Sequence, residues 1–318
     1  MLMTRATCLL AIATATAVFA MVHTPGATAA GQARSAPAAP WLVAHRGASA
    51  YAPENTIPAF QLAAQQGATF VEFDLQLTHD KQLVCLHDNS LERTTDVEQV
   101  FPDRSRPPAS GAGAKTWMLE DFTLAEVRRL DAGAWFDAKF RGTRIPTFGE
   151  TIEALRGRSG LFIEVKSPER YEGIERLIMG ELRSRGLDTP WADPRTPVLL
   201  QSFSADSLKI FAGTLRTTLP IHFLFGARDA AKWVTPEGLQ QIKAFSTGIS
   251  PEKVVIGQHG EAMQQARKLG LLITPYTFRA SAVTGYPDVS AEMRHYLETL
   301  RVDGVITDNP DLAPARAR

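Results

Sequence analysis

Two short segments bring carboxylates together in a pattern that suggests a cation site. In FVEFDLQL, the alternation of a strand places Glu72 and Asp74 on one face and the apolar side chains on the other. In FIEVK, the same alternation places Glu164 and Lys166 on one face. Buried carboxylates repel each other and lose hydration unless a cation compensates them. Three hard oxygen donors suit Ca²⁺ or Mg²⁺ better than Zn²⁺, so we predict a divalent cation on Glu72, Asp74 and Glu164, with internal ion pairs as the alternative.

Two histidines follow apolar runs and are candidates for proton transfer. His45 follows the run WLVA, and His87 follows LVCL. Imidazole titrates near neutral pH, with an ordinary pKa of about 6.5, so a pair of histidines beside a cation can serve as general acid and general base. Each histidine alone would more often be a packing or surface residue. If the acids hold the cation, the histidines are free for proton transfer.

These residues need a scaffold that brings strand ends together, and the chain has the pattern of one. Eight apolar, β-branched segments read as strands: Trp41–Gly47, Thr69–Leu77, Leu83–His87, Leu161–Lys166, Val198–Ser202, Ile221–Phe225, Leu271–Thr277 and Gly304–Thr307. Helical patterns lie between most of them, for example Ile174–Arg185 and Pro236–Ala244. Alternating strands and helices favour an α/β fold, a parallel (β/α)8 TIM barrel whose functional groups lie at the carboxyl ends of the strands.

One long gap interrupts this alternation, after the third expected strand. We expect an insertion at about residues 89–147, containing a Pro- and Gly-rich stretch at Phe101–Ala114. In a barrel, an insertion after a strand emerges at the catalytic face, where it can wall the substrate pocket. A loop with no function is the alternative.

The first forty residues have the pattern of an export signal and a linker. Arg5, an apolar run at Ala6–Val22 and the small residues Ala27-Thr28-Ala29 predict a signal peptide over residues 1–29. Residues 30–40 are expected to be a flexible mature N-terminus, and residues 41–318 a single catalytic domain. The protein is therefore expected outside the cytoplasm, in a periplasm or the extracellular space, with no stable membrane insertion after cleavage.

Composition excludes several classes of protein. The chain has 318 residues, 44% hydrophobic and 21% charged, with 34 basic and 34 acidic side chains, so the formal net charge is zero. No charge excess exists to attract nucleic acid or an anionic membrane. Outside the predicted signal Cys85 is the single cysteine, which cannot form an internal disulfide and is therefore expected to be buried. The oligomeric state cannot be read from the sequence.

Several ordered motifs resemble those of a known family. They are His45-Arg46-Gly47, Pro53-Glu54-Asn55-Thr56, Glu72-Phe73-Asp74, His87-Asp88, Glu164-Val165-Lys166, Gln201-Ser202-Phe203, Pro275-Tyr276-Thr277 and Gly304-Val305-Ile306-Thr307-Asp308. Together they resemble the glycerophosphodiester phosphodiesterases, of the exported bacterial kind, from about Trp41 to Asp311. A lone His-Arg-Gly is weak evidence, whereas ordered blocks at barrel spacing are specific.

The resemblance implies an activity and roles for the predicted residues. Such enzymes hydrolyse deacylated phospholipids such as glycerophosphocholine to glycerol 3-phosphate and an alcohol, and are thought to use the glycerol 2-hydroxyl as internal nucleophile, giving a cyclic phosphate that water opens. The resemblance assigns the divalent cation to Glu72, Asp74 and Glu164. Ca²⁺ is favoured because exported proteins meet it at higher concentration, and Mg²⁺ is possible. The resemblance makes His45 and His87 the acid/base pair, in an order that stays open, and adds Arg46 and Lys166 as phosphate-binding cations.

Three further side chains are expected to line the site, and Asp308 is expected to be structural. Glu54 either lines the cation site or caps the following helix, and Phe203 and Tyr276 are candidates for an apolar wall beside the glycerol carbons. Two alternatives to this activity remain: a phospholipase-D-like or phosphoinositide-cleaving lipase acting on intact lipid, and an exported barrel that binds phosphodiesters without catalysis.

Overall fold

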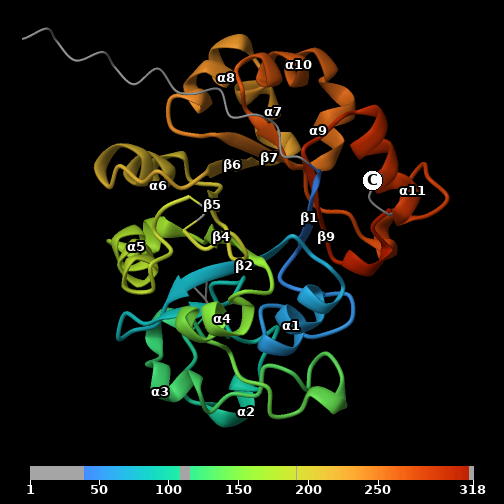
Figure 1. The fold of residues 1–318 in the computed structure, drawn as a ribbon. Coiled ribbons are helices and arrows are strands. Elements are labelled where there is room, and N and C mark those ends of the chain that lie inside the picture. The colour runs from blue at the N-terminus through green and yellow to red at the C-terminus, as the bar shows by residue number, and fades with distance from the viewer. Residues whose placement is uncertain (1–38, 108–114, 191, 315–318) are drawn as a thin grey trace, which may run out of the picture. The chain divides into compact units, whose positions relative to one another are not determined.

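The strands of the computed structural model form one sheet that curls into a barrel with helices outside it (Figure 1). The structure describes residues 39–107, 115–190 and 192–314, so the predicted signal peptide at 1–29 and nearly all of the expected flexible segment at 30–40 lie outside the described residues. The strands are β1 (Trp41–Ala44), β2 (Phe70–Leu77), β3 (Leu83–Cys85), β4 (Gly160–Val165), β5 (Val198–Ser202), β6 (Ile221–Phe225), β7 (Gly248–Pro251), β8 (Leu272–Ile273) and β9 (Gly304–Thr307).

The α-helices alternate with most of these strands. They are α1 (Ile57–Gln65), α2 (Val97–Val100), α3 (Leu124–Val127), α4 (Phe148–Leu155), α5 (Ile174–Ser184), α6 (Ala205–Lys209), α7 (Ala230–Trp233), α8 (Pro236–Lys243), α9 (Lys253–Gln258), α10 (Gly260–Lys268) and α11 (Val289–Arg294). Capping boxes begin two of them, with Thr123 and Glu126 at α3 and Thr147 and Glu150 at α4.

Eight parallel strands confirm the predicted (β/α)8 barrel. Their order is β8-β7-β6-β5-β4-β2-β1-β9, and the first strand of the chain pairs with the last. Backbone hydrogen bonds bring the chain around β8 against β9: Ile306 donates to the Pro275 carbonyl at 3.0 Å, and Phe278 donates to the Ile306 carbonyl at 2.9 Å. All carboxyl ends therefore meet at one end of the barrel, where the predicted site residues lie.

One of the eight expected strands was assigned wrongly. The segment Leu83–His87 was expected as a barrel strand, but β3 pairs antiparallel with β2, in a hairpin that extends β2 beyond the rim. The eighth parallel strand is instead β7, whose sequence Gly-Ile-Ser-Pro offers a single large apolar side chain. Short inward-facing residues replace the apolar run that the pattern search relied on.

The inner and outer faces of the strands follow the predicted alternation. On β2, Val71 and Phe73 pack in the core between barrel and helices, as do Ile163 and Val165 on β4. A separate apolar layer fills the barrel interior, formed by Trp41, Val43, Phe70, Phe162, Leu199, Leu272 and Ile306. Glu72, Asp74 and Glu164 lie on the inner face of the barrel at its carboxyl end. Because these carboxylates are buried, the electrostatic interactions between their charges are strong.

The segment between β3 and α4 has a hydrophobic core of its own. Trp117, Leu119, Phe122 and Leu130 are buried together there, and the Trp117 indole donates to the Phe101 carbonyl at 2.7 Å. Figure 1 shows α2 and α3 of this segment together, beside α4. The described part of residues 89–147 is therefore a folded unit attached to the barrel rim.

Candidate active site

Three carboxylates converge at the carboxyl ends of β2 and β4. Glu72, Asp74 and Glu164 are all buried, and their ligand oxygens lie within 4.8 Å of one another. Asp74 and Glu164 are register partners on the paired strands, which explains why they face each other. This is the cluster that the alternating patterns predicted.

Positive groups surround these acids. The Lys166 ammonium lies 2.8 Å from Glu164 Oε1 and 3.8 Å from Asp74 Oδ1. The Arg46 backbone N–H donates to Glu72 Oε2 at 2.8 Å, and its guanidinium Nε lies 3.5 Å from Asp74 Oδ2. Arg46 adopts φ of +54°, a left-handed conformation that turns the chain sharply after His45 and brings both groups onto the acids. The phosphate-binding cations predicted from the sequence thus border the carboxylate cluster.

Asn55 completes the support of Asp74. Its amide donates to Asp74 Oδ2 at 2.8 Å and its carbonyl accepts from the Asp74 backbone N–H at 3.1 Å. Asn55 is buried and has φ of +56°, a region that asparagine tolerates better than most residues. The motif at residues 53–56 therefore supports the carboxylate cluster through Asn55. The sequence analysis named this residue only as part of the motif and predicted no role for it.

The electrostatics differ between the three acids. Burial, together with Asp74 and Glu164, raises the pKa of Glu72 well above its ordinary value. Burial also raises the pKa of Glu164, although Lys166 opposes this. Burial works against ionisation of Asp74 as well, but Lys166 and Arg46 hold the pKa of Asp74 below its ordinary value. The cluster therefore retains repulsion that the protein's own cations do not fully offset.

This chemistry fits a divalent metal ion. The donor set consists of carboxylate oxygens, which hard cations prefer. Asp74 Oδ1 is buried and accepts no hydrogen bond, so a lone pair is available in the cluster. Glu72, Asp74 and Glu164 could hold such an ion together.

Each histidine is held by a carboxylate at one ring nitrogen. His45 Nδ1 lies 2.7 Å from Asp308 Oδ1, and His87 Nδ1 lies 2.6 Å from Asp88 Oδ1. Burial lowers the pKa of His45, and the Arg46 cation lowers it further, while Asp308 opposes both. With Nδ1 engaged, Nε2 of each ring is the nitrogen available to a substrate. Asp308, expected to be structural, is thus a partner of a candidate catalytic residue.

Glu54 bonds two arginines at the edge of the site. It accepts from Arg46 Nη1 at 2.9 Å and from both terminal nitrogens of Arg93 at 2.9 and 2.8 Å. Arg93 also contacts Asp88, the partner of His87. Glu54 makes no cap hydrogen bond at α1 and is not among the described residues that line the main cavity of the site. Glu54 therefore contacts Arg46 on one side and, on the other, Arg93, which contacts the Asp88 partner of His87.

A cavity of about 130 Å³ brings the predicted groups together. It is lined by His45, Arg46, His87, Glu164, Lys166, Gln201, Phe203, Leu224, Tyr276, Thr277, Arg279 and Ile306. Glu72 and Asp74 lie buried beside it, bonded to Arg46 and near Lys166.

One side of this cavity is aromatic. The rings of Phe203 and Tyr276 meet edge to face with centroids 5.8 Å apart, and the Lys166 ammonium lies 5.5 Å from the Phe203 ring. Phe203 is 47% exposed, so its ring is accessible at the mouth of the cavity. The two aromatic residues predicted to line the site therefore do so, beside its cations.

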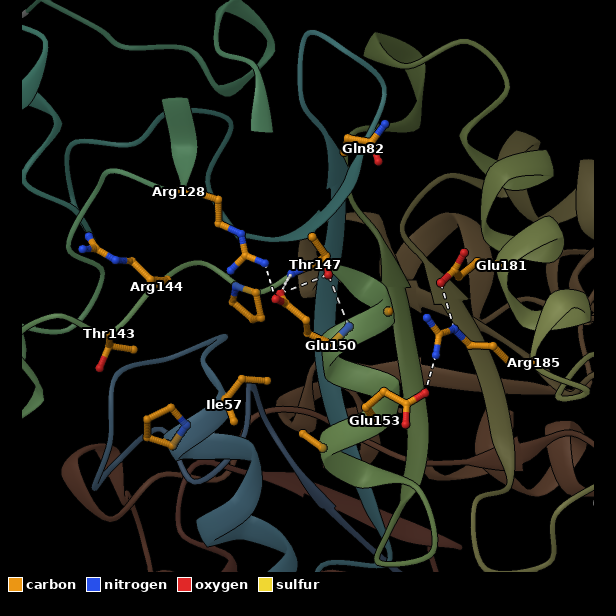
Figure 2. Close-up of a pocket in the computed structure, with 14 residues that line it drawn as sticks. Ile57, Gln82, Arg128, Thr143, Arg144, Thr147, Glu150, Glu153, Glu181 and Arg185 are labelled. Carbon is orange, nitrogen blue, oxygen red and sulfur yellow. Dashed lines mark hydrogen bonds and ion pairs between the residues drawn. The ribbon is translucent and has the colours of Figure 1, made fainter. Parts of the chain in front are cut away.

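A larger hollow of about 640 Å³ lies elsewhere, between α1, α4, α5 and the inserted segment (Figure 2). Its charged groups pair with each other: Arg128 with Glu150, and Arg185 with Glu153 and Glu181. Among the described residues that line it, none belongs to the carboxylate cluster or the histidine pair. The larger hollow is therefore not the one that holds the carboxylate cluster and the histidines.

Comparison with known proteins identifies the same site-bearing region. The model of the glycerophosphoryl diester phosphodiesterase family matches residues 45–312. A Bacillus subtilis (strain 168) protein named glycerophosphodiester phosphodiesterase is 34% identical over 278 residues, which cover 85% of this chain and 84% of that protein.

Two solved structures support the match. A phosphodiesterase from Oleispira antarctica, in complex with the product sn-glycerol-3-phosphate, is 26% identical with a TM-score of 0.66, covering 86% of this chain and 94% of the other. A glycerophosphodiester phosphodiesterase from Agrobacterium tumefaciens is 27% identical with a TM-score of 0.60, covering 86% and 98%. The chain therefore belongs to the glycerophosphoryl diester phosphodiesterase family and is an enzyme of that class.

Proposed function

We propose that this enzyme hydrolyses glycerophosphodiesters such as glycerophosphocholine to glycerol 3-phosphate and an alcohol, with a divalent cation and two histidines. The observation that carries the proposal is the convergence of three carboxylates, within 4.8 Å of one another, with two cations and two imidazoles at one cavity. A phosphodiester needs charge neutralisation, a base for the attacking oxygen and an acid for the departing alkoxide, and these groups supply all three.

Glu72, Asp74 and Glu164 would hold the cation, which when bound offsets negative charge on the phosphate. Arg46 and Lys166 lie at the cavity and would orient the non-bridging oxygens. The Nε2 atoms of His45 and His87 would exchange protons with the attacking and leaving oxygens. Asp308 and Asp88 would keep each ring in place through its Nδ1 atom.

Phe203 and Tyr276 would form the apolar side of the substrate site. The edge-to-face pair borders the cavity and offers it an apolar ring surface, which suits contact with aliphatic carbons. The cavity of about 130 Å³ suits a small polar substrate rather than the acyl chains of an intact lipid.

The identity of the ion and the site of action are part of the proposal. The oxygen donors suit Ca²⁺ and Mg²⁺ alike, and Ca²⁺ is favoured because exported proteins meet it at higher concentration. Export is inferred from the signal-like pattern of residues 1–29, followed by residues 30–40 as linker and 41–318 as catalytic domain. None of the described helices is long and apolar enough to cross a membrane.

The experiment measures release of glycerol 3-phosphate from glycerophosphocholine by the purified protein, untreated, after EDTA, and after addition of Ca²⁺ or Mg²⁺. We expect EDTA to abolish turnover and one of the ions to restore it. Glu72→Gln and His87→Ala should each remain folded and lose turnover, because each removes one group of the site.

Each other outcome has a consequence. Full activity in EDTA, or in folded Glu72→Gln, contradicts the cation assignment. Full activity in His87→Ala contradicts the acid/base pair. If the folded wild type cleaves intact phospholipid vesicles but not glycerophosphocholine, the lipase alternative replaces the proposal.

A further inference from the structure

Gln76 makes an unusual set of hydrogen bonds to the segment that carries His87. Its amide nitrogen donates to the Leu86 carbonyl at 2.7 Å, the His87 carbonyl at 3.2 Å and the Asp88 carbonyl at 2.7 Å. An amide nitrogen has two hydrogens, so three successive carbonyls share them around one atom. This curls the chain about the end of the Gln76 side chain.

The Gln76 amide is itself held in place. Its carbonyl oxygen accepts from the Tyr171 hydroxyl at 2.9 Å. Tyr171 lies in the segment that follows β4, the strand that carries Glu164. Both side chains are buried. The tyrosine therefore determines which end of the amide faces the three carbonyls, because the oxygen must receive the hydroxyl proton.

The segment that Gln76 binds has already left the sheet. β3 ends at Cys85, and the last backbone bond of this stretch to β2 is from the Leu86 N–H to the Asp74 carbonyl at 3.0 Å. Among the described residues, no donor other than Gln76 reaches the carbonyls of residues 86–88. Backbone pairing with β2 therefore ends one residue before His87, and the hydrogen bonds of the Gln76 amide continue the attachment of this segment to β2.

We propose that Gln76 is a positioning residue for His87, the link that places the imidazole and its Asp88 partner at the cavity. It lies on the same face of β2 as Glu72 and Asp74, so one strand sets the carboxylate cluster and the histidine in a fixed relation. The inference rests on the role proposed above for His87. Loss of the amide leaves three adjacent carbonyl dipoles without a donor, which releases the segment and displaces the ring.

The test compares Gln76→Leu, which keeps approximate size and removes the donor, with the wild type and with Gln241→Leu, an exposed glutamine on α8. We expect Gln76→Leu to lower kcat for glycerophosphocholine about 100-fold, since misplacement of a reacting group by about 1 Å has effects of that order. KM and the affinity for the restoring cation should stay within about threefold, because Arg46, Lys166 and the carboxylates are untouched. Gln241→Leu should behave as the wild type.

A double-variant cycle separates positioning from general stability. If Gln76 acts through His87, the combination of Gln76→Leu and His87→Ala has the turnover of His87→Ala alone; if it acts independently, the two losses multiply. Multiplying losses, or kcat within about twofold of wild type in folded Gln76→Leu, overturns the inference.

Tyr171→Phe decides the matter if Gln76→Leu does not fold. It removes only the hydroxyl that orients the amide, so we expect kcat to fall several-fold in the wild-type background and not at all beside His87→Ala. An unchanged kcat in Tyr171→Phe overturns the inference. A folded wild type that releases no glycerol 3-phosphate overturns the proposed function instead, which distinguishes the two failures.

Discussion

At the scale of single residues, the two histidines have the same kind of support. Asp308 joins His45 to Arg279, whose Nε donates to it at 2.7 Å, and Asp88 joins His87 to Arg93. The pairs differ in exposure, since the His45 side chain is 13% exposed and the His87 side chain 29%. His87 is therefore the one with easier access to solvent and to a departing product.

Asp308→Asn should lower kcat by on the order of 100-fold, because general acid/base groups contribute about that much or more and the amide no longer stabilises protonated His45. KM should change little. The control is Asp206→Asn, which removes an exposed carboxylate paired with Lys209 on α6. Steady-state kinetics of the two variants check the expectation, and equal activity would mean that the Asp308 bond is only structural.

Cys85 should resist thiol reagents in the folded protein. It is buried and contacts the Thr151 hydroxyl at 3.2 Å, and burial raises the pKa of its thiol, so little thiolate forms. Iodoacetamide treatment followed by peptide mass spectrometry should find Cys85 unmodified in native protein and modified in denaturant. Rapid modification of Cys85 in the native state would contradict the observed packing.

At the scale of elements, the inserted segment contacts residues of the candidate active site. Arg93 extends from it to Asp88 and Glu54, and its core is built around Trp117. The inserted unit is therefore connected to the site through the contacts of Arg93 with Asp88 and Glu54.

Trp117→Ala should destabilise this unit by about 3–5 kcal/mol, the usual cost of removing a buried tryptophan. The matched control is Trp135→Ala in the same segment, where the side chain is 40% exposed against 3% for Trp117 and the expected loss is about 0.5 kcal/mol. Hydrogen exchange should become faster across the described part of residues 89–147 in the first variant, before the barrel strands change. Uniform destabilisation of barrel and insertion would instead show a single cooperative unit.

Periodicity in the sequence predicted most elements and failed where it had no information. The strands β2 and β4 have long alternating segments, so their inward acids were correctly paired. The pattern of Leu83–His87 is equally apolar, but alternation is the same in parallel and antiparallel strands, and the partner of β3 depends on a hairpin turn. β7 was missed because its inward positions are Gly248 and Ser250, which carry no apolar signal.

The structure brings the predicted acids, histidines and cations together, but Arg279, which also lines the cavity, and several residues that hold these groups were not predicted. Asn55, Asp88, Arg93 and Gln76 support the site through side-chain contacts that no spacing rule encodes. Two signals were available: Asn55 lies in a quoted motif, and Gln76 continues the inward alternation of Glu72 and Asp74. The contact of Asp308 with His45 spans 263 residues, so it follows only from the closure of the barrel.

At the scale of the whole molecule, a cation held by the carboxylate cluster would couple the stability of the fold to cation binding. An ion that binds only the folded state raises its free energy of unfolding by about 2.7 kcal/mol at a hundredfold excess over Kd. Thermal unfolding of the wild type should therefore shift to higher Tm when Ca²⁺ or Mg²⁺ is added after EDTA.

Glu72→Gln should abolish this dependence of stability on the cation. Removal of one buried carboxylate relieves repulsion, while the amide oxygen can still accept from the Arg46 N–H, so the variant in EDTA should be more stable than the wild type by on the order of 1 kcal/mol. The added cation should no longer raise its Tm. A cation-dependent shift as large as that of the wild type would show that the ion binds elsewhere.

Pairing of β1 with β9 joins the earliest strand to the latest, and the bond from His45 to Asp308 depends on that pairing. During synthesis, a ribosome-bound chain that has not yet emerged through Asp308 has every cation ligand but lacks both the closing strand and the support of one imidazole. Turnover is therefore expected only after β9 and Asp308 have emerged and paired with β1 and His45.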